Sequence, residues 1–217
     1  MAEINLLEMY PKVDRPIEER SKTITPDVVR VARQFGREFF DGDRLYGYGG
    51  YRYDGRWRPI VERFRDHYGL PADARILDIG CAKGFMLHDF HELMPGATIA
   101  GLDVSAYAIE HAMESVRRYM MIGDAQDLPY DDHTFDLVIA INTIHNLERG
   151  ACAKAVREIV RVTRGDAFIT VDAWRDERER ERLQKWILTA KTYMSVHDWK
   201  RFFVEAGYAG DYYWFIA

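Results

Sequence analysis

The chain has 217 residues, of which 47% are hydrophobic and 30% are charged, and 30 basic against 35 acidic side chains give it a formal net charge of −5. This length suits one domain with a substantial core and is short for two complete domains. A mildly acidic chain has no general attraction for nucleic acid or for an anionic membrane, so we expect neither as a partner.

Cysteine usage and the first residues indicate the compartment. Cys81 and Cys152 are the only cysteines and show no Cys-x-x-Cys spacing. Neither a disulfide framework nor a zinc site is therefore indicated, and two reduced thiols predict a cytoplasmic protein. The opening MAEINLLEMYPK has no basic-then-apolar signal, and no apolar stretch approaches the roughly 20 residues that span a bilayer. We expect no export signal, no membrane segment and no metal.

The N-terminal part of the chain predicts a helical extension. A Thr-Pro pair of the N-cap type and the apolar spacing after it predict a helix over about 26–40 that ends near Gly42. A second helical pattern covers 57–68, and Gly69 stands where a C-terminal cap is expected.

The segment between these helices, DRLYGYGGYRYDGRW, places large rings on a glycine-rich backbone over 43–57. In one interpretation the segment closes over a ligand as a lid, with ring faces that attract a cation and an arginine that binds an anion. In the other it fastens the N-terminal helices to the sheet or forms an oligomer contact, so a homodimer stays open. We favour the lid, whose candidate residues are Tyr48, Tyr51, Arg52, Tyr53 and Trp57.

From residue 71 onward, short apolar runs alternate with helical patterns. This alternation predicts an α/β fold with a doubly wound, mostly parallel sheet of six to seven strands, helices on both faces and right-handed crossovers. It divides the chain into an N-terminal cap and lid segment, 1–70, and a main domain, 71–217. The expected strands are 75–79, 98–103, 119–122, 135–141, 167–172 and an aromatic C-terminal YYWFI, and the expected helices are 83–94, 105–117, 148–163 and 196–206.

The run RDERERERLQKW at 175–186 is too charged to be a core element on most faces. Its basic side chains at 175, 178, 182 and 185 fall on one helical stripe. An anionic acceptor can bind to such a stripe, but a solvated helix with acid–base pairs explains it too, and we favour the solvated helix.

The turn after strand 75–79 reads ILDIGCAKGF and places Gly80, Ala82 and Gly84 at spacings of two. Open parallel sheets bind ligands beyond the carboxyl ends of their strands, so this turn presents bare backbone at a candidate binding site. A nicotinamide dinucleotide needs G-x-G-x-x-G, and Phe85 occupies the place of the last glycine. That cofactor is therefore disfavoured.

Acidic residues stand at the ends of three consecutive strands, namely Asp78, Asp103 and Asp124. One carboxylate can face an ammonium group, and the next can accept both hydroxyls of a ribose. The third can accept from the adenine amino group while the N–H of Ala125 donates to a ring nitrogen. Any one of these acids is as readily a helix cap. Together they describe a ligand with an amine, a ribose and an adenine but no phosphate, which is the inventory of S-adenosylmethionine.

Over roughly 70–217 the chain resembles the class I S-adenosylmethionine-dependent methyltransferases, through LDIGCAKG, GLDVS, GDAQDLPY and FDLVIAINTIHNL in the family's order. The segments YGYGGY, GRW and GDYYWF are also similar to small methyltransferases that accompany bacterial surface-polysaccharide assembly. The resemblance implies a seven-stranded Rossmann-like sheet whose last strand runs antiparallel. The cofactor residues that it implies are Asp78, Gly80 and Gly84 around the methionine portion, with Ala82 in place of the family's middle glycine, Asp103 at the ribose, Val104 against the adenine face, Asp124 with Ala125 at the adenine edge, and Asn142 near the amino group.

The sulfonium already makes its methyl group electrophilic, so the protein has chiefly to place a nucleophile in line and exclude water. Where a proton has to be removed, His145 in INTIHNL is our candidate general base, because an imidazole accepts a proton at neutral pH. The alternative is that His145 positions its loop or packs under it. Asn146 beside it either orients an acceptor or caps a helix.

The leading hypothesis is therefore methyl transfer from S-adenosylmethionine to an oxygen or nitrogen of a small polar metabolite or sugar derivative, anionic ones included. Three alternatives stay open: cyclisation or cleavage of S-adenosylmethionine, non-catalytic binding of it, and NAD-dependent oxidoreduction. Protein and nucleic-acid acceptors are disfavoured, because the first usually needs an open groove and the second a basic surface.

Overall fold

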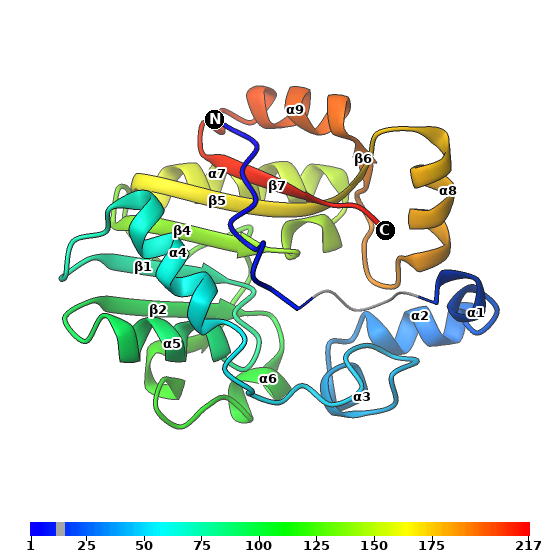
Figure 1. Ribbon diagram of the computed structural model, residues 1–217, viewed down its shortest axis with the longest axis horizontal. Coiled ribbons are helices and arrows are strands. Elements are labelled where there is room, and N and C mark those ends of the chain that lie inside the picture. The colour runs from blue at the N-terminus through cyan, green and yellow to red at the C-terminus, as the bar shows by residue number, and fades with distance from the viewer. Residues whose placement is uncertain (12–15) are drawn as a thin grey trace.

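The computed structural model describes residues 1–11 and 16–217 and shows a seven-stranded sheet with helices on both of its faces (Figure 1). The strand order is β3-β2-β1-β4-β5-β6, with β7 paired to β5, and the pairs are parallel. The predicted doubly wound, Rossmann-like fold is thereby confirmed. The strands are β1 (Arg75–Ile79), β2 (Thr98–Asp103), β3 (Met120–Ile122), β4 (Phe135–Ile141), β5 (Thr163–Trp174), β6 (Met194–Ser195) and β7 (Asp211–Phe215).

The last strand differs from the family expectation, because β7 pairs in parallel with β5 and not antiparallel. The helix α9 (Val196–Glu205) connects β6 to β7 and returns the chain along the sheet, so β7 starts from the same end as β5. The N-terminus lies beside this strand (Figure 1), where the Ile4 N–H donates to the Tyr212 carbonyl at 2.9 Å. The exposed edge of β7 is thus partly covered.

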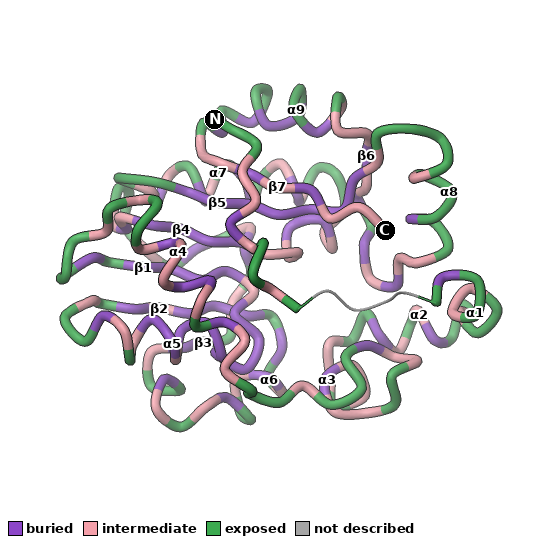
Figure 2. Tube along the Cα trace, viewed as in Figure 1, coloured by how far each residue is buried: buried purple, intermediate pink, exposed green. Residues whose placement is uncertain are grey.

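The two faces of the sheet carry separate apolar cores, since successive strand residues point to opposite sides. On one face Leu77 and Ile79 pack with α7 (Arg149–Val162) and α9. On the other face Ile76 packs with α4 (Arg58–Tyr68) and α5 (Phe85–Leu93). Figure 2 shows the central strands buried along most of their length.

Two predicted helices are wrong in extent. The helix predicted over 26–40 is two helices, α2 (Pro26–Ala32) and α3 (Arg37–Asp41), because Phe35 between them adopts a φ of 49°. A left-handed residue ends a helix, and the spacing of apolar residues does not reveal it. Similarly, α6 (Ala106–Glu110) stops well before residue 117, where the 3-10 turn η1 (Arg117–Tyr119) begins.

The N-terminal part shares its core with the sheet. Trp57 and Phe64 lie in the same apolar cluster as Ile76 and Phe168. Gly69 ends α4 in the left-handed conformation expected of a C-terminal cap, with a φ of 56°. The described N-terminal residues in this cluster therefore pack on the main domain, and the status of the N-terminal part as a separate unit stays a prediction.

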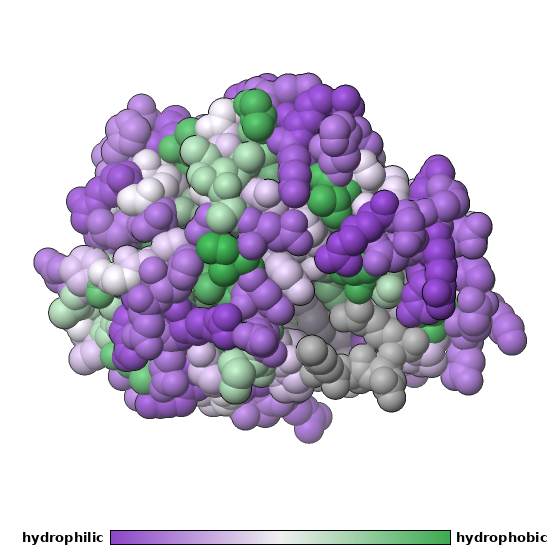
Figure 3. All heavy atoms as spheres, turned by 45° about the horizontal axis from the view of Figure 1, so that its top comes forward, coloured by the Kyte–Doolittle hydropathy of each residue, from purple (hydrophilic) through white to green (hydrophobic). Residues whose placement is uncertain are grey.

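The charged run forms α8 (Glu177–Trp186), which lies beside α1 (Ile17–Ser21) (Figure 1). Lys185 pairs with Glu18 at 2.7 Å, and the Arg20 guanidinium lies 4.7 Å from the ring centroid of Trp186. These contacts fit the solvated helix better than a binding stripe. Hydrophilic side chains cover most of the face in Figure 3, and within 1–11 and 16–217 no helix combines the length and apolarity of a membrane span.

Candidate cofactor and acceptor site

The turn after β1 passes close to the tip of β4. Gly80 has a φ of 78°, and a Cβ on it would stand 2.1 Å from Oγ1 of Thr143, so a side chain does not fit there. Ala82 also has a left-handed φ, 49°, which is strained for a residue with a Cβ. Gly84 opens α5, and a Cβ on it would meet Sδ of Met120 at 2.6 Å. A Cβ is thus excluded at Gly80, and all three positions of the turn hold left-handed backbone conformations.

Asp103 is held at the tip of β2 by two backbone donors. Its Oδ2 accepts from the Ala82 N–H and its Oδ1 from the Ser105 N–H, both at 2.8 Å. Burial raises the pKa of the Asp103 carboxyl in spite of these donors. Each oxygen keeps a further acceptor position, so the carboxylate can still accept two ligand hydroxyls.

Asp78 is a buried carboxyl without a hydrogen-bond or ion-pair partner in the described part of the chain. Its exposed fraction is 5%, and it accepts no hydrogen bond from the residues that the structure describes. Burial, and then the negative charge of Asp103, raises the pKa of Asp78 to about 7. A buried carboxylate is unfavourable unless a cation or donors reach it. A ligand ammonium would remove this cost.

A cavity of about 300 Å³ lies beyond the carboxyl ends of the strands. The predicted cofactor residues that line it are Gly80, Ala82, Asp103, Val104, Asp124, Ala125 and Asn142. Asp78 and Gly84 are not among the lining residues: the first lies two positions before Gly80, and the second packs against β3. The opposite wall comes from the N-terminal cap, through Arg33, Gln34, Phe35, Phe39, Phe40 and Tyr48.

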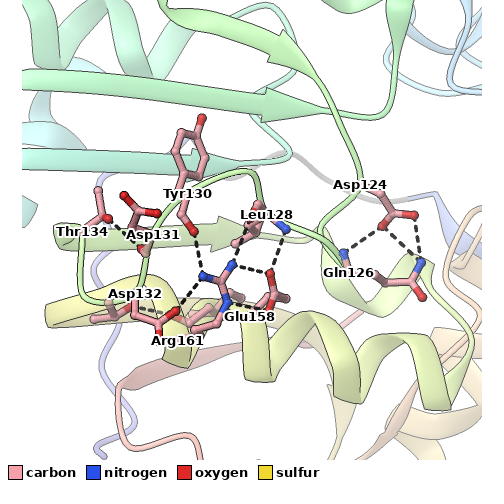
Figure 4. Close-up of polar contacts among 11 residues, drawn as sticks. Asp124, Gln126, Leu128, Tyr130, Asp131, Asp132, Thr134, Glu158 and Arg161 are labelled. Atoms are coloured by element: carbon pink, nitrogen blue, oxygen red, sulfur yellow. Dashed lines mark hydrogen bonds and ion pairs between the residues drawn. The ribbon is translucent and has the colours of Figure 1, made fainter.

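The loop after β3 is fixed by its own hydrogen bonds (Figure 4). The Asp124 carboxylate accepts from the backbone N–H of Gln126 and from its side-chain Nε2, both at 2.9 Å. Further along, Arg161 of α7 donates to the carbonyl oxygens of Leu128 and Tyr130 at 3.0 and 2.7 Å. The Ala125 N–H is therefore offered on a loop that is held at both ends.

Val104 and Asn142 border the cavity on either side of the glycine turn. Val104 is an apolar side chain with an exposed fraction of 61%, which suits a residue that covers a flat ring. Asn142 has a φ of 52°, and its Oδ1 accepts from the Thr170 hydroxyl at 2.9 Å. Asn146, which also lines the cavity, donates its Nδ2 to the Asn142 carbonyl at 3.2 Å and does not cap α7.

The aromatic loop, residues 43–57, has features of both interpretations, the lid over a ligand and the attachment of the cap to the sheet. Tyr48 alone among its predicted lid residues lines the cavity, within the described part of the chain. Tyr51 stacks on Phe85 with ring centroids 4.6 Å apart, and the Tyr53 hydroxyl donates to Asp89 at 2.6 Å. Trp57 is buried in the core, and Arg52 is exposed away from the cavity lining. In this structure the loop mainly fastens the cap to the sheet.

A partly buried ion pair joins the cap to the glycine turn. Lys83 is 7% exposed, and its Nζ lies 2.5 Å from Oδ2 of Asp41 at the end of α3. Tyr107 donates to the same oxygen at 2.8 Å. Although burial opposes it, hydrogen bonds from Lys83 and Tyr107 lower the pKa of Asp41. The cap is thus fixed on the tips of the strands that carry the acids.

His145, the predicted general base, does not line the cavity. It is 4% exposed in η2 (Ile144–Asn146), and its Nδ1 accepts from the Asp172 N–H at 2.9 Å. Burial lowers the pKa of His145, which keeps the imidazole neutral, with its proton on Nε2, 3.9 Å from Oδ2 of Asp172. Neither nitrogen offers a free lone pair, so the geometry supports the positioning interpretation.

Sequence reasoning missed the cap side of the cavity. Phe35, Phe39 and Phe40 were covered by one continuous helix in the prediction, which hid their common orientation toward the strand tips. Gly36 inside that helix was the available signal, because an interior glycine lowers the preference for a helix. Lys191 lies far from them in sequence and carries no motif.

Comparison with known proteins agrees with this geometry. Residues 76–166 match a family model described as a methyltransferase domain. The chain is 31% identical over 146 residues to a tRNA (carboxymethyluridine(34)-5-O)-methyltransferase of Arabidopsis thaliana, covering 66% of this chain and 34% of that protein. It is 37% identical over 78 residues to a malonyl-[acyl-carrier protein] O-methyltransferase of Legionella pneumophila, covering 34% of this chain and 28% of that protein. The chain thus spans about a third of these relatives.

A solved structure, the YcgJ protein of Bacillus subtilis, has the same fold, with a TM-score of 0.55 at 21% identity over 67% of this chain and 66% of that one. The fold is thus an α/β fold of the methyltransferase type. Over residues 76–166 the chain is similar to the class I S-adenosylmethionine-dependent methyltransferases, a family whose cofactor is S-adenosylmethionine. Unpartnered Asp78, the two acceptor positions on Asp103 and the bare backbone of Gly80 fit that cofactor.

Proposed function

We propose that the protein transfers the methyl group of S-adenosylmethionine to an oxygen or nitrogen atom of a small polar acceptor. The observation that carries this proposal is the pair of carboxyl groups, Asp78 and Asp103, which lie without a cation partner in the described chain beside a cavity of about 300 Å³. When bound, the cofactor supplies an electrophilic methyl group on a sulfonium. The carboxylates would hold its amine and ribose, and the aromatic wall would exclude water from the reacting atoms.

The names of two of the relatives, those from Arabidopsis thaliana and Legionella pneumophila, favour an oxygen acceptor. Both specify O-methylation, and the acceptors that they name contain a carboxymethyl or a malonyl group. The relative from Arabidopsis acts on tRNA by its name, whereas the net charge of −5 of this chain favours a small molecule here. A cytoplasmic location stays our prediction.

Thermal unfolding with two ligands tests the cofactor. We expect S-adenosylhomocysteine at a hundred times its Kd to raise the Tm by about 5–10 °C, because a ligand that binds only the folded state stabilises it. NAD at the same concentration should leave the Tm unchanged. A gain with NAD and none with S-adenosylhomocysteine would overturn the proposal.

Turnover then separates transfer from the alternatives. Protein incubated with S-adenosylmethionine alone should leave the cofactor nearly intact, whereas added metabolites should yield S-adenosylhomocysteine. Consumption without an acceptor would point to cyclisation or cleavage. Binding without product from any acceptor would point to a cofactor sensor.

A further inference from the structure

Two cationic side chains stand at one end of the cavity, on segments far apart in the sequence. Arg33 follows α2, and Lys191 lies between α8 and β6. A hydrogen bond of 3.2 Å from Nη2 of Arg33 to the carbonyl of Ala190 brings the two segments together. The N–H of Lys191 in turn donates to the His145 carbonyl at 2.9 Å. The cations therefore share the β4 end of the cavity, across from Asp103 at the end of β2 and Asp124 in the loop after β3.

These two cations have little compensation from the protein. Within the described residues Arg33 forms no ion pair with a carboxylate. The Nζ of Lys191 lies 3.9 Å from Oε1 of Glu148, whose side chain is 76% exposed. An exposed pair at that distance contributes little. A ligand anion between Arg33 and Lys191 would meet both charges.

Among residues 1–11 and 16–217, none at the same end of the cavity offers a general base. The acids that line the cavity are Asp103 and Asp124, and each already accepts hydrogen bonds at the cofactor end. The Nδ1 lone pair of His145 accepts from the Asp172 N–H and its Nε2 holds the proton, and a phenol such as Tyr48 is protonated at neutral pH. An alcohol or ammonium acceptor must lose a proton to attack, whereas a carboxylate is already ionised.

We infer that the acceptor atom is a carboxylate oxygen and that Arg33 and Lys191 bind this carboxylate. The inference rests on the proposed methyl transfer and narrows its substrate to a carboxylic acid. One carboxylate oxygen would accept from the cations, and the other would face the methyl group.

The step needs no proton transfer. A lone pair of the free carboxylate oxygen forms the new O–C bond to the methyl carbon, and the C–S bond breaks with its electron pair going to sulfur. The carboxylate loses its negative charge and the sulfonium its positive charge, so the products are a neutral methyl ester and a thioether. Neutralisation of two opposite charges is favoured in a cavity that excludes water.

Methyl esters are cleaved by mild alkali, and this property gives the test. The full chain is incubated with S-adenosylmethionine labelled in its methyl group and with a nucleic-acid-free, deproteinised extract of small metabolites. Parallel reactions contain succinate, 1,4-butanediol or 1,4-diaminobutane, which differ only in the terminal groups. We expect label in the extract and in succinate, and its release as volatile methanol at alkaline pH.

Two variants test whether Arg33 and Lys191 bind the acceptor carboxylate. Arg33→Gln and Lys191→Gln should each raise KM for the acid acceptor about tenfold or more while the affinity for S-adenosylhomocysteine, measured by calorimetry, changes less than twofold. Arg37→Gln is the matched control, because Arg37 pairs with Glu38 on the same cap and does not line the cavity. It should leave both quantities unchanged.

The outcomes separate this inference from the proposed function. Labelled product that resists alkali, or label in the diol or diamine but not in the acid, would overturn the carboxylate assignment while methyl transfer stands. A tenfold loss of S-adenosylhomocysteine affinity in Arg33→Gln or Lys191→Gln would reassign the cations to the cofactor's own carboxylate and overturn it too. No transfer to any acceptor would overturn both.

Discussion

Asp136 at the amino end of the parallel sheet and Asp78 and Asp103 at its carboxyl end have opposite electrostatic environments. At the amino end Asp136 of β4 accepts two hydrogen bonds from Arg164 of β5, at 2.7 and 2.8 Å, and one from the Arg75 N–H of β1 at 2.8 Å. The bonds from Arg164 are the main cause of a lowered pKa at Asp136. At the carboxyl end Asp78 and Asp103 have raised pKa values and no cation within the described residues.

This difference shows where the fold is complete without a ligand. At the amino end Asp136 is paired within the protein, so its ion pair with Arg164 belongs to folding. The carboxyl end leaves two acids unfavourably buried, a cost that persists in a protein only where function requires it. The comparison predicts that acids at the two ends respond oppositely to substitution.

The largest expected effect is at Asp78. Its folded pKa of about 7 lies above the unfolded value, so the folded state holds the proton more tightly and the unfolding free energy falls as the pH rises from about 4 to 7. Asp78→Asn removes this dependence and should stabilise the ligand-free protein by about 2–4 kcal/mol at pH 8, and not at pH 4. Urea unfolding at the two pH values measures it.

The same variant should bind S-adenosylhomocysteine more weakly. In the wild type the affinity should increase as the pH rises through about 7, because an ionised Asp78 attracts the ammonium. Calorimetry of Asp78→Asn should show a lower affinity that does not vary over this range. Equal stability of the two proteins at pH 8 would argue against an uncompensated carboxyl.

Asp103→Ala should lower the affinity for S-adenosylhomocysteine by about 10- to 100-fold, or about 1–3 kcal/mol, because two ribose hydroxyls lose their acceptor. Asp103→Asn keeps one carbonyl oxygen and should fall between the wild type and the alanine variant. Calorimetry gives the affinities, and Asp136→Asn serves as the control at the other end of the sheet. Unchanged binding in Asp103→Ala would remove this residue from the ribose site.

At the amino end, Asp136→Asn should lower the unfolding free energy by about 1–2 kcal/mol at pH 7, through loss of the charged pair with the partly exposed Arg164. Because the folded pKa of Asp136 is lowered, its contribution is present above about pH 4 and disappears as the pH falls further. Chemical unfolding at pH 7 and pH 3 measures the change. A stabilised variant would contradict the comparison between the two ends.

The smallest effect is expected at His145. Since burial lowers its folded pKa, the stability that it contributes is present above about pH 6.5 and is lost as the pH falls below that value. His145→Gln should lower the unfolding free energy by about 1 kcal/mol at pH 7.5, because the Asp172 N–H loses a buried acceptor. The rate at saturating acceptor should change less than threefold. A decrease of a hundredfold or more would instead support His145 as a general base.

The sequence predicts the carboxyl end of the sheet well, because its signals are local. The strand bounds of β1, β2 and β4 are those expected, and the acids at the tips of β2 and β3 line the cavity. Gly80 carries the left-handed φ and the close approach that its motif implies.

The cap and acceptor side are less predictable because their signals are not local. The break at Phe35 depends on a single backbone conformation inside an apolar pattern. Arg33 and Lys191 meet only in the folded chain, and the direction of the His145 ring depends on a hydrogen bond from β5. The antiparallel last strand expected from the family is replaced by a parallel one, since α9 returns the chain along the sheet.

The most direct measurement is a crystal structure of the protein with S-adenosylhomocysteine bound. We predict the ligand's amino nitrogen within hydrogen-bond distance of Asp78 and both ribose hydroxyls on Asp103. A ligand bound elsewhere, or one whose amine and ribose face other groups while these two carboxyls stay without partners, would contradict the account.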